Sequence, residues 1–133
     1  MRSIFVNLAV ADPAASRGFF SALGFGFNDQ FSDGNTACLV IEENICAMLM
    51  SPGRFAEFVV GDVADSTRST EVLLALSAES REEVDRIADA ALASGGADWK
   101  PSQDHGFMYG RSFTDPDGHV WEVVWMDPTA VTG

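Results

Sequence analysis

The feature that most constrains the fold of this chain is an order of elements that the sequence predicts twice. In each half, a strand is followed by a helix and then by three further strands. In the first half the predicted strands cover residues 4–10, 26–31, 36–41 and 45–50. Asp12 and Pro13 begin the intervening helix as N-cap and first helical residue, and Gly24 ends it.

The second half repeats this order, with predicted strands over residues 70–78, 97–100, 107–114 and 119–126. Ser80 and Glu83 form a capping box at the start of its helix, and Gly95-Gly96 ends that helix. Such a repeat indicates two units that close around a shared interior, because units of this size bury too little apolar surface to be stable on their own. We therefore predict a single α+β domain over residues 1–133, with module one at 1–51, a connection at 52–68 and module two at 69–128.

Composition excludes several classes of protein. With 47% hydrophobic residues, the chain has enough apolar side chains for one core. The net charge of −12 repels phosphate backbones, so we expect no nucleic-acid partner. No apolar run is long enough to span a membrane, and the N-terminus reads as a strand rather than a signal peptide, so we expect a cytoplasmic protein.

Cys38 and Cys46 lie in apolar runs without CxxC spacing. Buried, reduced thiols are the simplest interpretation in a cytosolic protein, and a disulfide between neighbouring strands is the alternative. Among the basic residues, the candidates for a pocket that accepts an anion are Arg54, Arg68 and Arg111.

The segment from Asp115 to Met126 carries the strongest local signal. Asp115-Pro116-Asp117-Gly118 fits a type I turn, and a strand follows it. Because side chains alternate along a strand, Trp121 and Val123 share one face, which we expect to pack on a helix, and Glu122 points to the opposite, concave side. A carboxylate there is either a solvent-exposed or arginine-paired charge, or a metal ligand or acid–base group in a pocket.

The repeated order, the turn with Glu122 four residues after Gly118, and the glycine exits of both helices resemble the vicinal oxygen chelate superfamily, which includes glyoxalases, bleomycin-resistance proteins and dioxygenases. Within it, the runs 69–77 and 106–113 are similar to a bacterial group labelled predicted lactoylglutathione lyases. The resemblance implies two βαβββ modules that form a curved mixed sheet around a pocket. It also implies a small-molecule ligand and a homodimer.

Metal-dependent members of that superfamily hold a divalent ion with one inward residue from each of four strands. By resemblance, these positions fall on Phe5, Met48, Leu73 and Glu122, and three of these four are apolar. One carboxylate cannot hold a catalytic metal, so we expect no metal ligand set and no cofactor. An alternative ligand set of Asn7, Glu71 and Glu122 would be a poor site for nickel or zinc and a tolerable one for magnesium or manganese.

His105 and His119 do not restore a metal site, and we expect both to be surface or turn residues. By resemblance, Met108 and Ser112 face the pocket, together with Asn7, Met48, Glu71 and Leu73. Tyr109 and Arg111, on the other face of the same strand, have packing and charge pairing as their simplest roles.

Two functions remain open, and the sequence leaves undecided whether the protein is an enzyme. The first is a metal-free protein that binds an apolar or aromatic small molecule. The second is a metal-dependent lyase or isomerase of the glyoxalase type that uses Glu122. A third possibility is a protein whose pocket is filled by its own side chains and whose role is dimeric assembly only. Phe55 and Phe58 make a lid over the pocket plausible for the connection.

Overall fold

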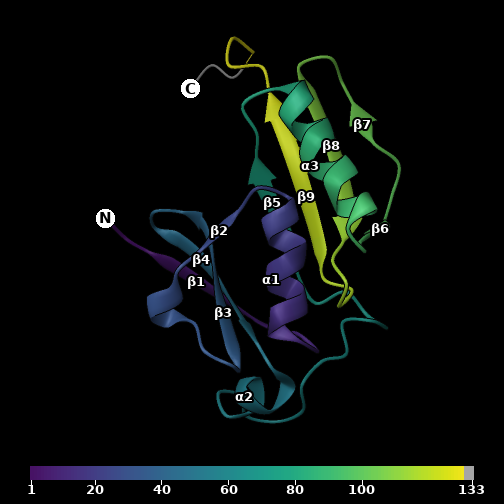
Figure 1. Ribbon diagram of the computed structural model, residues 1–133. Helices are drawn as coiled ribbons and strands as arrows, with labels where there is room; N and C mark the ends of the chain where they lie inside the picture. Colours follow the sequence, from purple (N-terminus) through teal and green to yellow (C-terminus); the bar gives the residue numbers. More distant parts are fainter. Residues whose placement is uncertain (131–133) are drawn as a thin grey trace. The chain divides into compact units, whose positions relative to one another are not determined.

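A computed structural model describes residues 1–130 (Figure 1). The chain divides into two compact units, Met1–Ala64 and a second unit that begins at Asp65. Each unit contains a strand, a long helix and then further strands, three in the first unit and four in the second, and each has its own mixed sheet. The prediction of an α+β fold built from two βαβββ modules is confirmed.

The first unit has a four-stranded sheet with the order β1-β4-β3-β2, in which only the β1–β4 pair is parallel. Its elements are β1 (Ile4–Ala9), α1 (Pro13–Ala22), β2 (Gly26–Phe27), the 3₁₀ helix η1 (Asp29–Phe31), β3 (Thr36–Glu42), β4 (Ile45–Met50) and α2 (Pro52–Ala56). Asp12 caps α1 as predicted, since its carboxylate accepts a hydrogen bond from the amide of Ala14 at 3.0 Å.

The second unit has a sheet with the order β5-β9-β8-β6, in which β5 and β9 are parallel and β7 pairs with β8. Its elements are β5 (Leu73–Ser77), α3 (Arg81–Ala93), β6 (Ala97–Asp98), β7 (Gln103–Asp104), β8 (Met108–Thr114) and β9 (Val120–Met126). Ser80 caps α3 as predicted, because its hydroxyl accepts a hydrogen bond from the amide of Glu83 at 3.1 Å.

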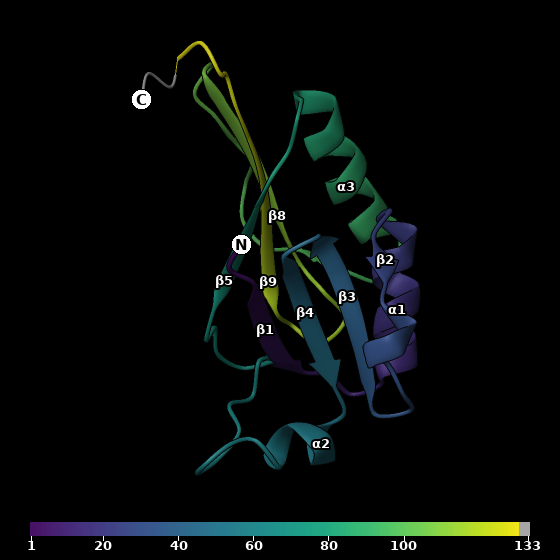
Figure 2. The same cartoon turned by 90° about the vertical axis from the view of Figure 1, so that its left-hand side faces the viewer.

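In each unit one long helix covers one face of the unit's own sheet. Figures 1 and 2 show α1 against β3 and α3 against β8 and β9, in agreement with the contacts of these elements. The residues on the helix side of the sheets form the two cores. They include Leu39, Ala47 and Leu49 in the first unit and Phe113, Trp121 and Val123 in the second, all at most 1% exposed.

The other face of each sheet has no helix of its own unit packed across it in the described part of the chain, and we call it the open face. Alternation places Glu122 on the open face of the second sheet, between Val120 and Val124, as predicted. In the first sheet the open face carries Cys46 and Met48 of β4.

One predicted strand was too long, and one strand was missed. The strand predicted over residues 26–31 ends at Phe27, because the Asn28 side chain accepts a hydrogen bond from the amide of Gln30 and begins η1. The strand β7 was not predicted, and it pairs antiparallel with β8 through Asp104, the partner of Tyr109. Asn and Asp side chains compete with the sheet for backbone amides, which explains the first error.

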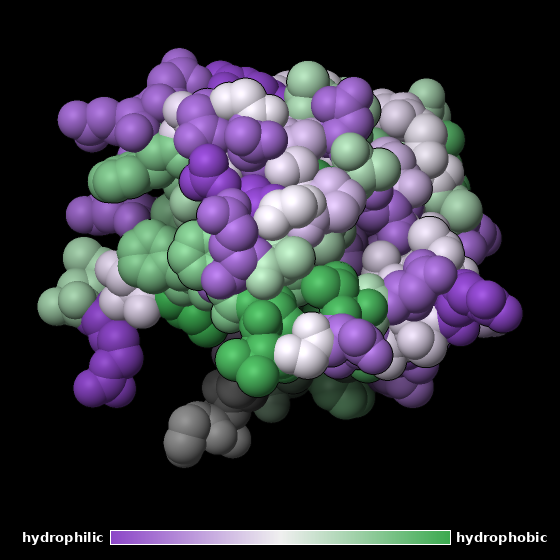
Figure 3. Space-filling view, turned by 90° about the horizontal axis from the view of Figure 1, so that it is seen from below, coloured by the Kyte–Doolittle hydropathy of each residue, from purple (hydrophilic) through white to green (hydrophobic). Residues whose placement is uncertain are grey.

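The connection after β4 starts with α2, which contains Phe55 of the predicted apolar turn. Large apolar side chains of the following segment are exposed: Phe58 to 70% and Val60 to 103% of their full area. Hydrophobic side chains exposed among hydrophilic ones are visible in Figure 3. No helix in residues 1–130 is long and apolar enough to cross a membrane.

The predicted turn before β9 is closed by a hydrogen bond from the Gly118 amide to the Asp115 carbonyl, at 3.0 Å. The Asp115 carboxylate accepts hydrogen bonds from the amides of Asp117 and His119 and from the Trp121 indole. Burial raises the pKa of Asp115, while the protonated form of His119 and these three donors oppose that rise. The turn is therefore fixed by side-chain as well as backbone bonds.

Gly118 is the position in this turn that depends on glycine. Its φ is +88°, and a Cβ there would lie 2.6 Å from the carbonyl oxygen of Ser66. We expect Gly118→Ala to lower the free energy of unfolding by about 1–3 kcal/mol, because the left-handed backbone and the contact both resist a side chain. Urea unfolding measures this loss. Gly34→Ala is the control, since a Cβ at Gly34 meets open space; equal effects of the two changes would contradict the explanation.

Candidate functional site

The candidate site is a pocket on the open face of the second sheet, which we call the Glu122 pocket. It has a volume of about 220 Å³ and is lined by Lys100, Pro101, Gln103, Met108, Gly110, Arg111, Ser112, Glu122 and Val124. Strands β8 and β9 supply its floor, because Ser112 is the direct partner of Glu122 and Gly110 that of Val124. Three of the predicted site residues, Met108, Ser112 and Glu122, therefore come together.

Lys100 is the cation of this pocket. Its ammonium nitrogen lies 3.1 Å from Oε1 of Glu122, at ion-pair distance but without hydrogen-bond geometry. The Glu122 side chain is 21% exposed and that of Lys100 is 39% exposed, so water partly screens the pair. Lys100 also lies over the Trp99 ring, 5.4 Å from its centroid.

Ser112 is the polar group of the pocket floor. The residue is 5% exposed, and none of the described residues gives its hydroxyl oxygen a hydrogen bond. A buried hydroxyl without a partner costs about 1–3 kcal/mol, and such groups are rare in native proteins. A ligand or a water molecule with one hydrogen-bonding group would remove this cost.

The sequence analysis missed Lys100 and named Arg54, Arg68 and Arg111 as the candidate cations of a pocket; of these three, only Arg111 lines the Glu122 pocket. The Arg111 guanidinium points to α3, where it donates hydrogen bonds to Asp85 at 3.0 Å and Asp89 at 2.8 Å. The only available signal was that Lys100 is the single lysine of the chain, and no spacing linked it to Glu122.

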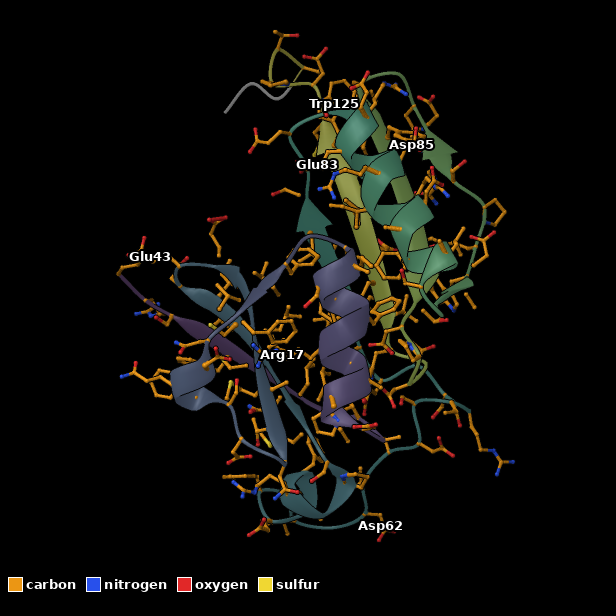
Figure 4. All side chains as sticks on the ribbon, in the orientation of Figure 1. Arg17, Glu43, Asp62, Glu83, Asp85 and Trp125 are labelled. Atoms are coloured by element: carbon orange, nitrogen blue, oxygen red, sulfur yellow. The ribbon has the colours of Figure 1, made fainter. Side chains whose placement is uncertain are left out.

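The helix side of the same strands carries a charged cluster. The Tyr109 hydroxyl donates a hydrogen bond to Asp85 at 2.6 Å, and Figure 4 shows Asp85 on α3. This bond and the hydrogen bond and positive charge of Arg111 hold the pKa of Asp85 below its usual range. The simplest roles expected for Tyr109 and Arg111, packing and charge pairing, agree with these contacts.

This cluster makes stability depend on pH. The pKa of Asp85 is lower in the folded chain, so its stabilisation is present above the unfolded value and is lost as pH falls through the folded one. We expect Asp85→Asn to lower the free energy of unfolding by about 1 kcal/mol at pH 7. The difference in this free energy between variant and wild type should disappear below roughly pH 4. Urea titrations at pH 7 and pH 3 measure it. Asp89→Asn, at a more exposed side chain, is the control, and an Asp85→Asn gap that is the same at both pH values would contradict this reading.

The remaining predicted pocket residues lie elsewhere. Met48 lines a separate hollow in the first unit, and Asn7, its Cα partner on β1, is exposed. Leu73 is 52% exposed on the open face of the second sheet. Glu71 precedes β5, and its carboxylate lies 3.6 Å from Nδ1 of His119.

The expectation for the histidines holds in part. His105 is exposed and stacks on Phe107, whereas His119 ends the turn but is only 3% exposed, so it is not a surface residue.

A larger hollow of about 460 Å³ lies beside the turn before β9 and is lined by residues 66–70 and by Asp115, Pro116 and Gly118 among others. We regard the Glu122 pocket as the candidate site, because it combines a carboxylate, a cation and a buried hydroxyl without a partner among the described residues.

A family model described as the Glyoxalase/Bleomycin resistance protein/Dioxygenase superfamily matches residues 3–123. This protein belongs to that superfamily. No match was found among curated proteins.

Several solved structures share the fold. A hypothetical protein from S. aureus is similar at 26% identity and a TM-score of 0.79, with 94% of each chain covered. A glyoxalase-related enzyme from Fulvimarina pelagi has 20% identity and a TM-score of 0.79, with 94% of this chain and 88% of that chain covered. A fosfomycin resistance protein from Listeria monocytogenes has 18% identity and a TM-score of 0.67, with 94% and 93% covered.

The superfamily often binds divalent metals, and the residues present here do not fit one. Three of the four positions implied by resemblance, Phe5, Met48 and Leu73, offer no nitrogen or oxygen side-chain ligand. Across residues 1–130 no group of three or more His, Cys, Asp and Glu side chains is placed to hold an ion.

The alternative ligand set of Asn7, Glu71 and Glu122 does not form a metal site either, as its two members in the second unit show. Ala75 is the partner of Glu122, and Glu71 lies four residues before Ala75. Glu71 lies outside β5, and its carboxylate is 3.6 Å from Nδ1 of His119, whereas that of Glu122 is 3.1 Å from the Lys100 ammonium. The two carboxylates thus have different partners.

Proposed function

We propose that this protein binds a small apolar or aromatic molecule in the Glu122 pocket and does so without a divalent metal. One observation carries the proposal. The Ser112 hydroxyl is buried without a hydrogen-bond partner among the described residues, and the Glu122 carboxylate belongs to its cross-strand neighbour on the same pocket floor. Small-molecule sites combine apolar walls with a few convergent polar groups, and the side chains of Met108 and Val124 supply apolar wall here.

The polar groups define what part of a ligand they would accept. Ser112 offers one hydroxyl as donor or acceptor, and Glu122 offers a carboxylate acceptor whose charge Lys100 balances. A ligand with an apolar or aromatic body and one hydrogen-bond donor, such as a phenol or a primary amide, matches this arrangement. A strongly anionic ligand matches less well, because the chain carries a net charge of −12.

A panel of neutral phenols and aromatic amides tests the proposal, with binding read as a rise in melting temperature and by ligand-observed NMR. We expect at least one member to raise the melting temperature of the wild type and to bind more weakly to Ser112→Ala. A panel without a single binder, or a binder that is indifferent to Ser112→Ala and to Glu122→Gln, would contradict it.

The alternative function is a metal-dependent lyase or isomerase of the glyoxalase type. Metal analysis after incubation with manganese, magnesium, nickel or zinc separates the two functions. The binding proposal expects no stoichiometric ion from this set. One ion per chain that is lost in Glu122→Gln would favour the enzyme and overturn the metal-free proposal.

We also propose a cytoplasmic homodimer. Superfamily proteins are often dimers, and this chain exposes large apolar side chains such as Phe58, Val60 and Leu73 that a second copy would cover. Sedimentation velocity at micromolar concentrations is expected to give a species of twice the 14.3 kDa chain mass. A strictly monomeric profile across the concentration range would contradict the dimer.

A further inference from the structure

Three sulfur-containing residues gather on the open face of the first sheet, away from the Glu122 pocket in sequence and in a different unit. Cys38 of β3 is the direct cross-strand partner of Met48 of β4. Cys46 lies two residues before Met48 on the same strand, so all three side chains point to the same face. Directly opposed side chains have Cβ atoms about 4.5–5.5 Å apart, and diagonal neighbours are about 7–8 Å apart.

The two cysteines lie on adjacent strands, diagonal to each other in the register, because Cys38 pairs with Met48 and Cys46 pairs with Val40. They are not joined in a disulfide. Cys38 is 1% exposed, whereas Cys46 is half-buried. Both cysteines are therefore free thiols on adjacent strands, one buried and one half-buried.

A hollow opens above these sulfur atoms. It has a volume of about 240 Å³, and Cys38, Cys46 and Met48 line it together with Ser3, Phe5, Asn28, Phe31, Glu43 and Asn44. Figure 4 shows Glu43 at the turn between β3 and β4. Phe5 and Phe31 add apolar surface to the lining of the hollow, although both side chains are themselves exposed.

We propose that Cys38, Cys46 and Met48 form a binding site for a soft monovalent cation, specifically Cu(I). Thiolate and thioether ligands select Cu(I), and this ion is satisfied by two or three sulfur ligands. Zinc and nickel sites need further nitrogen or sulfur ligands, and the described part of the chain holds no group of three His, Cys, Asp and Glu residues. The ordinary role of such cysteines is that of small buried hydrophobic residues, but that role does not require two thiols and a thioether to line one hollow.

Binding would replace the two thiol protons by the ion. Both cysteines coordinate as thiolates, the Met48 thioether is the third ligand, and two protons leave to solvent without any change of oxidation state. The inference does not depend on the small-molecule proposal, because no residue of the Glu122 pocket takes part.

The test is anaerobic titration of the reduced protein with Cu(I) supplied as its bicinchoninate complex. We expect the wild type to take one Cu(I) per chain, with near-ultraviolet thiolate-to-copper absorption and protection of both cysteines from iodoacetamide. Zinc chloride in place of the copper complex is expected to give no such protection. A wild type that leaves the copper on the chelator, or cysteines that stay equally reactive with copper present, would overturn the site.

Two variants, one that removes a thiol and one that removes only the thioether, test the site in protein that is still folded. Cys46→Ser, at a half-buried position, is expected to weaken copper binding by at least about 100-fold, since even outer-shell changes at metal sites cost 10–100-fold. Met48→Leu keeps the volume and removes only the thioether, so a loss of about tenfold is expected. Circular dichroism checks both folds, and unchanged copper affinity in folded Cys46→Ser would refute the assignment.

Discussion

Replacing Trp121 by alanine is expected to lower the free energy of unfolding by about 3–5 kcal/mol, the largest stability effect we predict. Trp121 is 1% exposed and lies between β5 and β8, opposite Leu74 and Phe113. Its indole nitrogen donates a hydrogen bond to the Asp115 carboxylate at 3.0 Å. The change therefore removes a core side chain and one of the bonds that fix the turn before β9.

Thermal and urea unfolding measure this effect, and a fall in melting temperature of roughly 10 °C or more is expected. Trp99→Ala is the matched control, because Trp99 is 40% exposed and a comparable loss of surface there is expected to cost less than about 1 kcal/mol. Comparable losses for the two variants would show that the core is not centred on Trp121.

The largest expected effect on binding comes from filling the Glu122 pocket. Gly110 lies on the pocket floor between Met108 and Ser112, and a Cβ there would meet the Val124 side chain at 3.4 Å without a positive φ. Gly110→Leu is therefore expected to fold and to occupy the space of the ligand. We predict that binding of the best panel member weakens by at least about 100-fold, the cost of losing roughly 3 kcal/mol of contacts.

The control for this variant is Gly53→Leu, at a glycine with open space around it in the other unit. Circular dichroism and the melting temperature establish that both variants fold. Full ligand affinity in a folded Gly110→Leu protein would place the binding site elsewhere.

Most of the fold was predictable because local signals and the repeat agree. The caps at Asp12 and Ser80 and the alternation in β4 and β9 each specify an element without knowledge of the rest. The errors lie where a short-range competitor acts. Asn28 captures a backbone amide and ends β2, and β7 is a two-residue strand with too short a pattern to detect.

The candidate site was predictable only in part. The side of the sheet that Glu122, Ser112 and Met108 occupy follows from alternation and register. Lys100 lies in the segment between β6 and β7, and its approach to Glu122 depends on the path of that segment in space. The burial of His119 likewise depends on how the turn packs, which a turn motif does not specify.

The most direct test of a metal-free binding site at Glu122 is a chemical-shift map of the ¹⁵N-labelled protein with the tightest phenol or amide of the panel. The account predicts that the largest amide shifts cluster in residues 108–112 and 122–124 and vanish in Gly110→Leu. It also predicts that chelator-treated and untreated protein give the same map. Shifts centred outside these residues, or binding that disappears after treatment with the chelator, would contradict the account.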